Sequence, residues 1–156
     1  MKNHPFAICT KGNGPLAASF TNQKQDNKDV AGGTTDTTYN TLGANYALGA
    51  AKVFALYQTT KKSDSSVNNK YVAVSGSYDI GATKLLAQFG ELENKDGVKS
   101  KLSALGADYA LSKRTTAYAR YETINDKAGV AAVTGFTAET GNVTRARTAI
   151  GVRHSF

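Results

Sequence analysis

Hydrophobic and polar residues alternate along most of this chain with a period of two. The pattern is clearest in four seven-residue segments whose odd positions are in turn aliphatic, small, aromatic or His, and apolar; they span 42–48, 74–80, 105–111 and 150–156. Successive side chains of a β-strand point to opposite faces, so this alternation predicts strands with one apolar and one polar face. The first three segments begin 32 and 31 residues apart, the length of a hairpin with its loops.

A second repeat precedes each of these segments and places an aliphatic residue or Ala, an Ala and an aromatic residue at alternate positions. Its copies span 16–20, 53–57, 85–89 and 117–121. The two repeats together predict an all-β, antiparallel, up-and-down arrangement of about eight strands, at 14–23, 37–48, 51–61, 69–80, 83–93, 99–111, 114–124 and 143–156. Most of these strands have the roughly 9–11 residues that a tilted membrane strand needs, or slightly more.

The predicted connections alternate between short and long. Short turns fall at 49–50, 81–82 and 112–113, and longer polar loops at 24–36, 62–68, 94–98 and 125–142. Short turns at one end of the strands and long loops at the other are typical of an outer-membrane β-barrel. No window approaches the roughly 18 apolar residues of a membrane-spanning helix, which excludes a helical membrane protein.

Aromatic residues recur near both ends of the predicted apolar face. Near the long loops they are Phe20, Tyr57, Phe89 and Tyr121, and near the short turns they are Tyr46, Tyr78, Tyr109 and, in the equivalent position, His154. Amphipathic rings at both boundaries of an apolar band predict two aromatic girdles at membrane–water interfaces. The alternative is a soluble β-sandwich whose core packs the same rings.

The opposite face carries small and polar residues and is predicted to line an aqueous lumen. Its charged and aromatic members include Lys52, Lys84, Asp108, Arg114, Tyr118, Arg120, Arg145, Arg147 and Arg153. Arg120, Arg145 and Arg147 share one parity on the last two strands and predict a basic ladder. Such a ladder lowers the energy of an anion in a pore. Alternatively, these arginines pair with Asp or Glu, or contact lipopolysaccharide phosphate.

The composition narrows the functional classes further. The net charge of +7 permits an anionic partner, but the basic residues are dispersed and the aromatics lie on the apolar face, where they cannot stack on bases. We therefore expect no nucleic-acid partner. Cys9 is the only cysteine, and His4 and His154 lie at opposite ends of the chain. One cysteine excludes an intramolecular disulfide. One cysteine and two distant histidines are also few for the ligands of a metal site or the members of a catalytic triad.

A glycine-rich pattern and an acidic cluster are weak indications of a binding site. Residues 12–17 match a G-x-G-x-x-A pattern, but that motif requires a strand before it and a helix after it, and neither is predicted. Glu91, Glu93 and Asp96 could attract Ca²⁺, yet charged loop tips are usually only solvated. We expect neither an enzyme nor a cofactor.

Two motifs carry a resemblance to a known family. The hairpin Tyr109-Ala-Leu-Ser-Lys-Arg-Thr-Thr-Ala-Tyr118 and the ending Gly151-Val-Arg153-His154-Ser-Phe156 resemble the Gram-negative general porins of the β-proteobacterial type. The resemblance implies the C-terminal half of a 16-stranded barrel over residues 14–156. It also implies an outer-membrane location, homotrimers, passage of small hydrophilic solutes, and contact with lipid and lipopolysaccharide. Residues 1–13 depart from the family pattern: they match no part of it, and they form no recognisable signal peptide because His4 and Pro5 interrupt the segment.

The terminal aromatic Phe156 resembles the signal read by the outer-membrane assembly machinery. Two other interpretations stay open alongside the porin fragment. One is a complete small eight-stranded outer-membrane protein with a structural or adhesion role, and the other is a soluble ligand-binding β-barrel.

Overall fold

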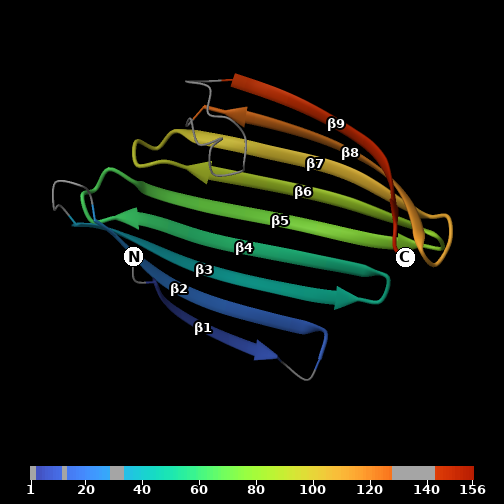
Figure 1. The fold of residues 1–156 in the computed structure, drawn as a ribbon, viewed down its shortest axis with the longest axis horizontal. Coiled ribbons are helices and arrows are strands. Elements are labelled where there is room, and N and C mark those ends of the chain that lie inside the picture. Colours follow the sequence, from blue (N-terminus) through green and yellow to red (C-terminus); the bar gives the residue numbers. More distant parts are fainter. Residues whose placement is uncertain (1–2, 12–13, 29–33, 128–142) are drawn as a thin grey trace.

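The protein forms a single antiparallel sheet in which every strand pairs with the next one along the chain (Figure 1). The computed structural model describes residues 3–11, 14–28, 34–127 and 143–156, with the backbone alone at 3–11, 27–28 and 34. The strands within these residues are β1 (Asn3–Lys11), β2 (Leu16–Lys28), β3 (Thr34–Leu48), β4 (Ala51–Lys62), β5 (Asn68–Ile80), β6 (Thr83–Glu93), β7 (Lys99–Ala110), β8 (Thr115–Asp126) and β9 (Val143–His154). None of the described residues forms a helix that is long and apolar enough to cross a membrane.

The eight predicted strands correspond to β2–β9, most of them within a residue or two. The largest difference is that β2 and β3 extend well beyond the predicted ends, to Lys28 and back to Thr34. Hydrophobic alternation stops near residue 23, but the backbone ladder continues through polar residues that pair across the two strands. Lys24 Nζ, for example, lies 2.7 Å from Asp36 Oδ2.

Strand β1 lies in the segment 1–13, for which the sequence analysis expected no strand. It pairs antiparallel with β2, so that Ile8 lies opposite Phe20 in the register. Pro5 obscures the signal, because proline lacks the N–H that a central strand needs. An edge strand tolerates it, and β1 is an edge of the sheet.

The connections alternate as predicted, with tight turns at one end of the strands. Gly49 and Gly81 begin the turns β3–β4 and β5–β6 with φ of 57°. Positive φ at the first residue of a two-residue hairpin favours glycine, which has no Cβ to clash. At the other end lie the connections 63–67 and 94–98. The predicted loops 24–36 and 125–142 fall partly outside the described residues.

The two faces of the sheet differ in how far their side chains are covered. On β5, Val72 and Val74 are exposed, whereas Tyr71, Ala73 and Ser75, which alternate with them along the strand, are half-buried. All residues in the described ranges that are buried lie on the second face: Thr37, Gly90, Ser100, Ile124 and Asp126. Side chains crowd together on the inner side of a curved sheet, so we call this the inner face and the opposite one the outer face.

Candidate functional site

The outer face is a continuous band of exposed apolar side chains. The pairing register places Val53, Val74, Leu85, Leu105 and Ile150 on this face, and Leu105 and Ile150 are 63% and 82% exposed. An apolar surface that follows every strand from β2 to β9 exceeds the patches that soluble monomers expose. This face therefore requires an apolar environment, which argues against the soluble ligand-binding alternative.

Aromatic rings lie on the outer face near both ends of this band. The register puts Tyr78 opposite Leu85 near the short turns, and Phe89 opposite Val74 towards the long loops. The residues predicted for the two girdles all share the outer face: Phe20, Tyr46, Tyr57, Tyr78, Phe89, Tyr109, Tyr121 and His154.

The C-terminal end of β9 is held against the β7–β8 turn. His154 Nδ1 lies 2.9 Å from Thr115 Oγ1, and the Ser155 N–H donates to the Arg114 carbonyl at 2.9 Å. The ring of Phe156 meets His154 edge-on, with centroids 4.9 Å apart, and is otherwise fully exposed.

The inner face carries all but one of the predicted lumen residues. Within the strands these are Lys52, Lys84, Asp108, Tyr118, Arg120, Arg145, Arg147 and Arg153. Arg114 is the exception, because β8 begins at Thr115 and Arg114 belongs to the preceding turn. Its backbone N–H donates to Ser112 Oγ at 3.2 Å, which closes the turn one residue later than the alternation predicted.

Arg120 lies flat against the inner face and contacts four neighbours. Its Nη2 is 2.5 Å from Asp108 Oδ1, and Nη1 donates to the carbonyls of Ala107 and Ala119 at 2.9 Å each. The guanidinium carbon lies 5.6 Å from the centroid of the Tyr118 ring, within range of a cation–π contact.

Other cations of the inner face are also paired with carboxylates. Arg147 Nη2 donates to Glu122 Oε1 at 3.1 Å, and Lys84 Nζ lies 3.4 Å from Asp79 Oδ1. For Arg120 and Arg147, the structure thus shows the carboxylate pairing that the sequence analysis left open. Basic residues still outnumber acidic ones on the described part of this face: Lys52, Lys62, Lys84, Arg120, Arg145, Arg147 and Arg153 against Asp79, Asp108, Glu122 and Asp126.

Three larger residues of the inner face were not predicted from the sequence. Phe54, Leu56 and Tyr71 border a hollow of about 460 Å³ that is otherwise lined mostly by small residues such as Ala17 and Gly43. Their parity within β4 and β5 could have identified them. They were overlooked because the expectation for this face favoured small and polar residues.

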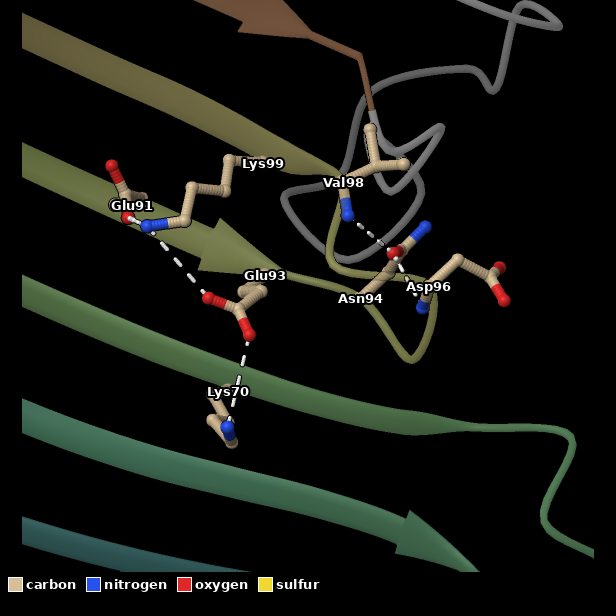
Figure 2. A network of polar contacts seen from close by, with 7 residues as sticks. All are labelled: Lys70, Glu91, Glu93, Asn94, Asp96, Val98 and Lys99. Atoms are coloured by element: carbon tan, nitrogen blue, oxygen red, sulfur yellow. Dashed lines mark hydrogen bonds and ion pairs between the residues drawn. The ribbon is translucent and has the colours of Figure 1, made fainter.

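A network of lysines and glutamates lies on the outer face just beyond Phe89, towards the long loops. Figure 2 shows four of its members, Lys70, Glu91, Glu93 and Lys99. Lys99 Nζ is 2.7 Å from Glu91 Oε1 and 3.7 Å from Glu93 Oε2. Lys70 reaches Glu93 at 3.7 Å from β5, and Lys101 reaches Glu91 at 3.8 Å. We call these five residues the outer network.

The β6–β7 connection next to the outer network is closed by the side chain of Asn94 together with two backbone hydrogen bonds, from Asn94 N–H to the Val98 carbonyl at 3.0 Å and from Gly97 N–H to the Asn94 carbonyl at 3.1 Å. Asn94 Oδ1 accepts hydrogen bonds from the backbone N–H of Asp96 at 3.0 Å and of Val98 at 2.9 Å (Figure 2). Gly97 has a φ of 75°, a conformation that glycine adopts without strain. The turn thereby fixes the position at which β7 starts with Lys99.

The acidic residues of this region contact lysines in the structure. Glu91 and Glu93 belong to the outer network, and Asp96 Oδ1 accepts a hydrogen bond from Lys95 Nζ at 2.9 Å. Among the residues that the structure describes, no group of three or more His, Cys, Asp or Glu is placed to hold a metal ion.

Comparison with solved structures gives the fold a close counterpart. The anion-selective porin from Comamonas acidovorans superposes with a TM-score of 0.80 at 26% identity, over 96% of this chain and 48% of that one. OmpT of Vibrio cholerae superposes with a TM-score of 0.70 at 18% identity, over 98% of this chain and 56% of that one. The second likeness, at its low identity, concerns the fold alone.

Sequence comparison agrees. Outer membrane porin protein 32 of Delftia acidovorans is 35% identical over 124 residues, which are 74% of this chain and 34% of that protein. The chain thus spans about a third of this relative and about half of the solved Comamonas porin. The family model described as Gram-negative porin matches residues 6–129. The chain belongs to the Gram-negative porin family.

Proposed function

We propose that the described strands form about half of the wall of a passive diffusion channel for small hydrophilic solutes. The family lies in the bacterial outer membrane, and so does this chain. The observation that carries the proposal is the contrast between the faces, with an apolar band between aromatic rings outside and a polar, charged surface inside. An aqueous lumen behind a lipid-facing apolar band is the general construction of porins.

Further strands complete the wall in this proposal. A sheet with β1 and β9 at its edges leaves backbone groups unpaired, and bilayers do not tolerate such edges. We propose that 14–156 form one porin barrel domain and that β1 is part of the same wall. The match of the family model from residue 6 onward supports including β1.

Neighbouring residues on opposite faces of β5 provide a test of which face lines the lumen. Ser75→Trp places a bulky ring on the inner face and is expected to lower the single-channel conductance in planar bilayers, because it narrows the path. Val74→Trp places the same ring on the outer face and is the matched control. An equal loss in both variants, or a porin preparation that never conducts, would contradict the proposal.

We also propose a preference for anionic solutes. The excess of basic over acidic residues on the inner face supports it, since positive wall charges lower the energy of an anion in a pore. The Comamonas relative is described as anion-selective, which agrees with this reading. Carboxylate pairing of Arg120 and Arg147 reduces the effect without abolishing the net positive charge.

Changing one wall charge tests this preference. Arg147→Glu is expected to lower the anion-to-cation permeability ratio about threefold. At roughly 10 Å and about 0.1 M salt, each of the two units of charge shifts the energies of an anion and a cation by about 0.15 kcal/mol in opposite directions. The measurement is the reversal potential across a KCl gradient. Lys113→Glu in the β7–β8 turn makes the same charge change away from the wall and should have a smaller effect. An unchanged reversal potential in Arg147→Glu would contradict the assignment.

Outer-leaflet lipid phosphate is the partner that we propose for the outer network. Lys70, Lys99 and Lys101 outnumber Glu91 and Glu93, and all five lie on the lipid-facing side just beyond the aromatic Phe89. That is the depth of lipid headgroups. Lysines near an anionic membrane surface contribute about 1 kcal/mol each.

The combined variant Lys70→Gln, Lys99→Gln and Lys101→Gln tests this partner. We expect the folded protein to lose binding to lipopolysaccharide vesicles by roughly fivefold per lysine removed. Lys113→Gln, at the opposite end of the strands, is the control and should keep its binding. Equal binding by the triple variant would refute the lipid contact and leave the network as a set of cross-strand ion pairs.

A trimeric state and a purely passive role complete the proposal. One solved OmpT structure from Vibrio cholerae is described as a trimer form, at 17% identity and a TM-score of 0.66 to this chain. The family to which the chain belongs consists of channels, so we propose no enzymatic activity. Cross-linking in detergent followed by mass measurement checks the trimer, and a monomer that conducts would contradict it.

A further inference from the structure

The position of Arg120 on the inner face depends on the absence of a side chain beneath it. The register pairs Arg120 directly with Gly106 on β7. A Cβ at Gly106 would lie 2.7 Å from Arg120 Cδ and 3.0 Å from both Nε and Nη1. The arginine therefore lies across the β7 backbone in a space that only glycine leaves open.

Asp108 holds the other end of this side chain. Its Oδ1 accepts from Arg120 Nη2 at 2.5 Å, and its side chain is only 18% exposed, against 37% for Arg120. Three of the five N–H donors of the guanidinium are used by Asp108, Ala107 and Ala119. The side chain is thus fixed along the wall instead of projecting from it.

Asp108 also lies between two polar side chains of the neighbouring strands. The register places it directly opposite Lys84 on β6 and opposite Tyr118 on β8. Tyr118 in turn covers Gly151, where a Cβ would come within 2.6 Å of the ring carbon Cζ. Arg120 and Tyr118 both belong to β8. Arg120 thus lies flat over Gly106 of β7, where Asp108 holds it, and Tyr118 lies flat over Gly151 of β9.

We propose that Asp108 is a positioning residue that holds Arg120 flat over Gly106, and that this clamp limits the anion selectivity of the wall. The inference rests on the proposed channel function. Asp108 acts in two ways: its charge compensates Arg120, and its hydrogen bond keeps the guanidinium away from the path of the solute. Releasing Arg120 brings an uncompensated positive charge closer to passing anions.

Two variants separate charge from position. Asp108→Asn keeps the size of the side chain but removes one negative charge, and should raise the anion-to-cation permeability ratio about twofold. Gly106→Ala leaves all charges unchanged but forces Arg120 off the wall. It should therefore raise the same ratio while lowering conductance, since the displaced side chain enters the lumen. Both are measured as reversal potential and single-channel conductance of the complete porin.

Two controls keep the result interpretable. Gly43→Ala makes the same change on the inner face of β3, where its Cβ meets only the rotatable Ser19 Oγ at 3.2 Å, and should leave selectivity unchanged. Gly106→Ala in an Arg120→Gln background should also lose its effect, because there is no guanidinium left to release. Heat-modifiable migration on gels confirms that each variant is folded.

The outcomes distinguish a failure of the channel function from a failure of the clamp. A parent porin that does not conduct would overturn the channel function itself. A conducting parent whose Asp108→Asn and Gly106→Ala variants keep the parental reversal potential would overturn the clamp alone. If Gly106→Ala fails to fold, Asp108→Asn is compared with Asp79→Asn, which removes an inner-face carboxylate that pairs with Lys84 instead of Arg120. A larger rise of the permeability ratio in Asp108→Asn supports the clamp, and an equal rise or none refutes it.

Discussion

At the scale of single residues, the inner face is shaped as much by its glycines as by its charges. Gly90, Gly106 and Gly151 each lie beneath a larger side chain, namely Tyr71, Arg120 and Tyr118. In a strand interior, glycine usually marks a close approach of another group. Here that group is in each case a neighbouring inner-face side chain, so these glycines keep the wall thin and its large side chains flat.

The Gly151–Tyr118 contact yields a prediction about stability. Gly151→Ala places a Cβ 2.5 Å from Tyr118 Oη, so the ring must move, and we expect a loss of about 1–3 kcal/mol in the free energy of unfolding. Gly76→Ala is the matched control, because its Cβ meets only the Lys52 carbonyl at an ordinary 3.5 Å. It should gain about 0.4–1 kcal/mol from the reduced freedom of the unfolded chain.

Urea unfolding from lipid vesicles measures both changes. The opposite signs are the informative feature, since a general intolerance of strand substitution predicts losses at both positions. A stabilised Gly151→Ala variant would show that the ring shifts without cost.

At the scale of strands, alternation along the chain was enough to predict most of the sheet. It assigned Asp108, Arg120 and Arg147 to one face, and register and burial place them together there. It could not supply the Asp108–Arg120 contact, because parity gives the face of a side chain but neither its neighbour across the ladder nor its rotamer. It also began the strand at Arg114, one residue before β8 starts, since a turn boundary depends on hydrogen bonds such as the one to Ser112.

The ends of β2 and β3 that extend beyond the apolar band were the hardest to predict, because parity alone does not reveal contacts across strands. Beyond residue 23, β2 and β3 carry polar residues on both faces, so no alternation of hydrophobicity marks them. Contacts between side chains hold them together, as between Lys24 Nζ and Asp36 Oδ2 at 2.7 Å. These contacts appear only once the register is known.

The end of β9 gives a prediction at this scale. Phe156 lies two residues beyond His154, the last residue of β9, and is fully exposed, with its only ring contact in the described structure to His154. We expect deletion of Phe156 to reduce insertion into the outer membrane of cells while leaving folding into detergent micelles intact, because a signal for assembly acts only where the machinery is present.

Tyr109→Ala is the comparison, since it removes an aromatic from the outer face at the same end of the strands. A girdle role alone predicts similar, small losses for the two variants, both in cells and in micelles. Quantifying the protein in isolated outer membranes distinguishes the two roles, and equal insertion of both variants would remove the signal role from Phe156.

At the scale of the whole molecule, the apolar outer face and the two open edges impose one requirement. The outer face needs lipid, yet β1 and β9 would carry unpaired N–H and C=O groups into it. Each unsatisfied group in hydrocarbon costs several kcal/mol. A sheet of this kind therefore enters a bilayer only when its edges are paired, either with further strands of a porin or with a second copy of the chain.

Refolding the 156-residue chain by itself tests this requirement. In lipid vesicles we expect protease-resistant material only in species larger than one chain, and a yield that rises with protein concentration, because edge pairing between copies is bimolecular. Unheated gels and light scattering in detergent give the mass, and dilution gives the concentration dependence. A protease-resistant, membrane-inserted monomer formed equally well at every concentration would mean that β1 and β9 close on each other. The inner face would then line a barrel of nine strands, narrow enough for its own side chains to fill most of the lumen.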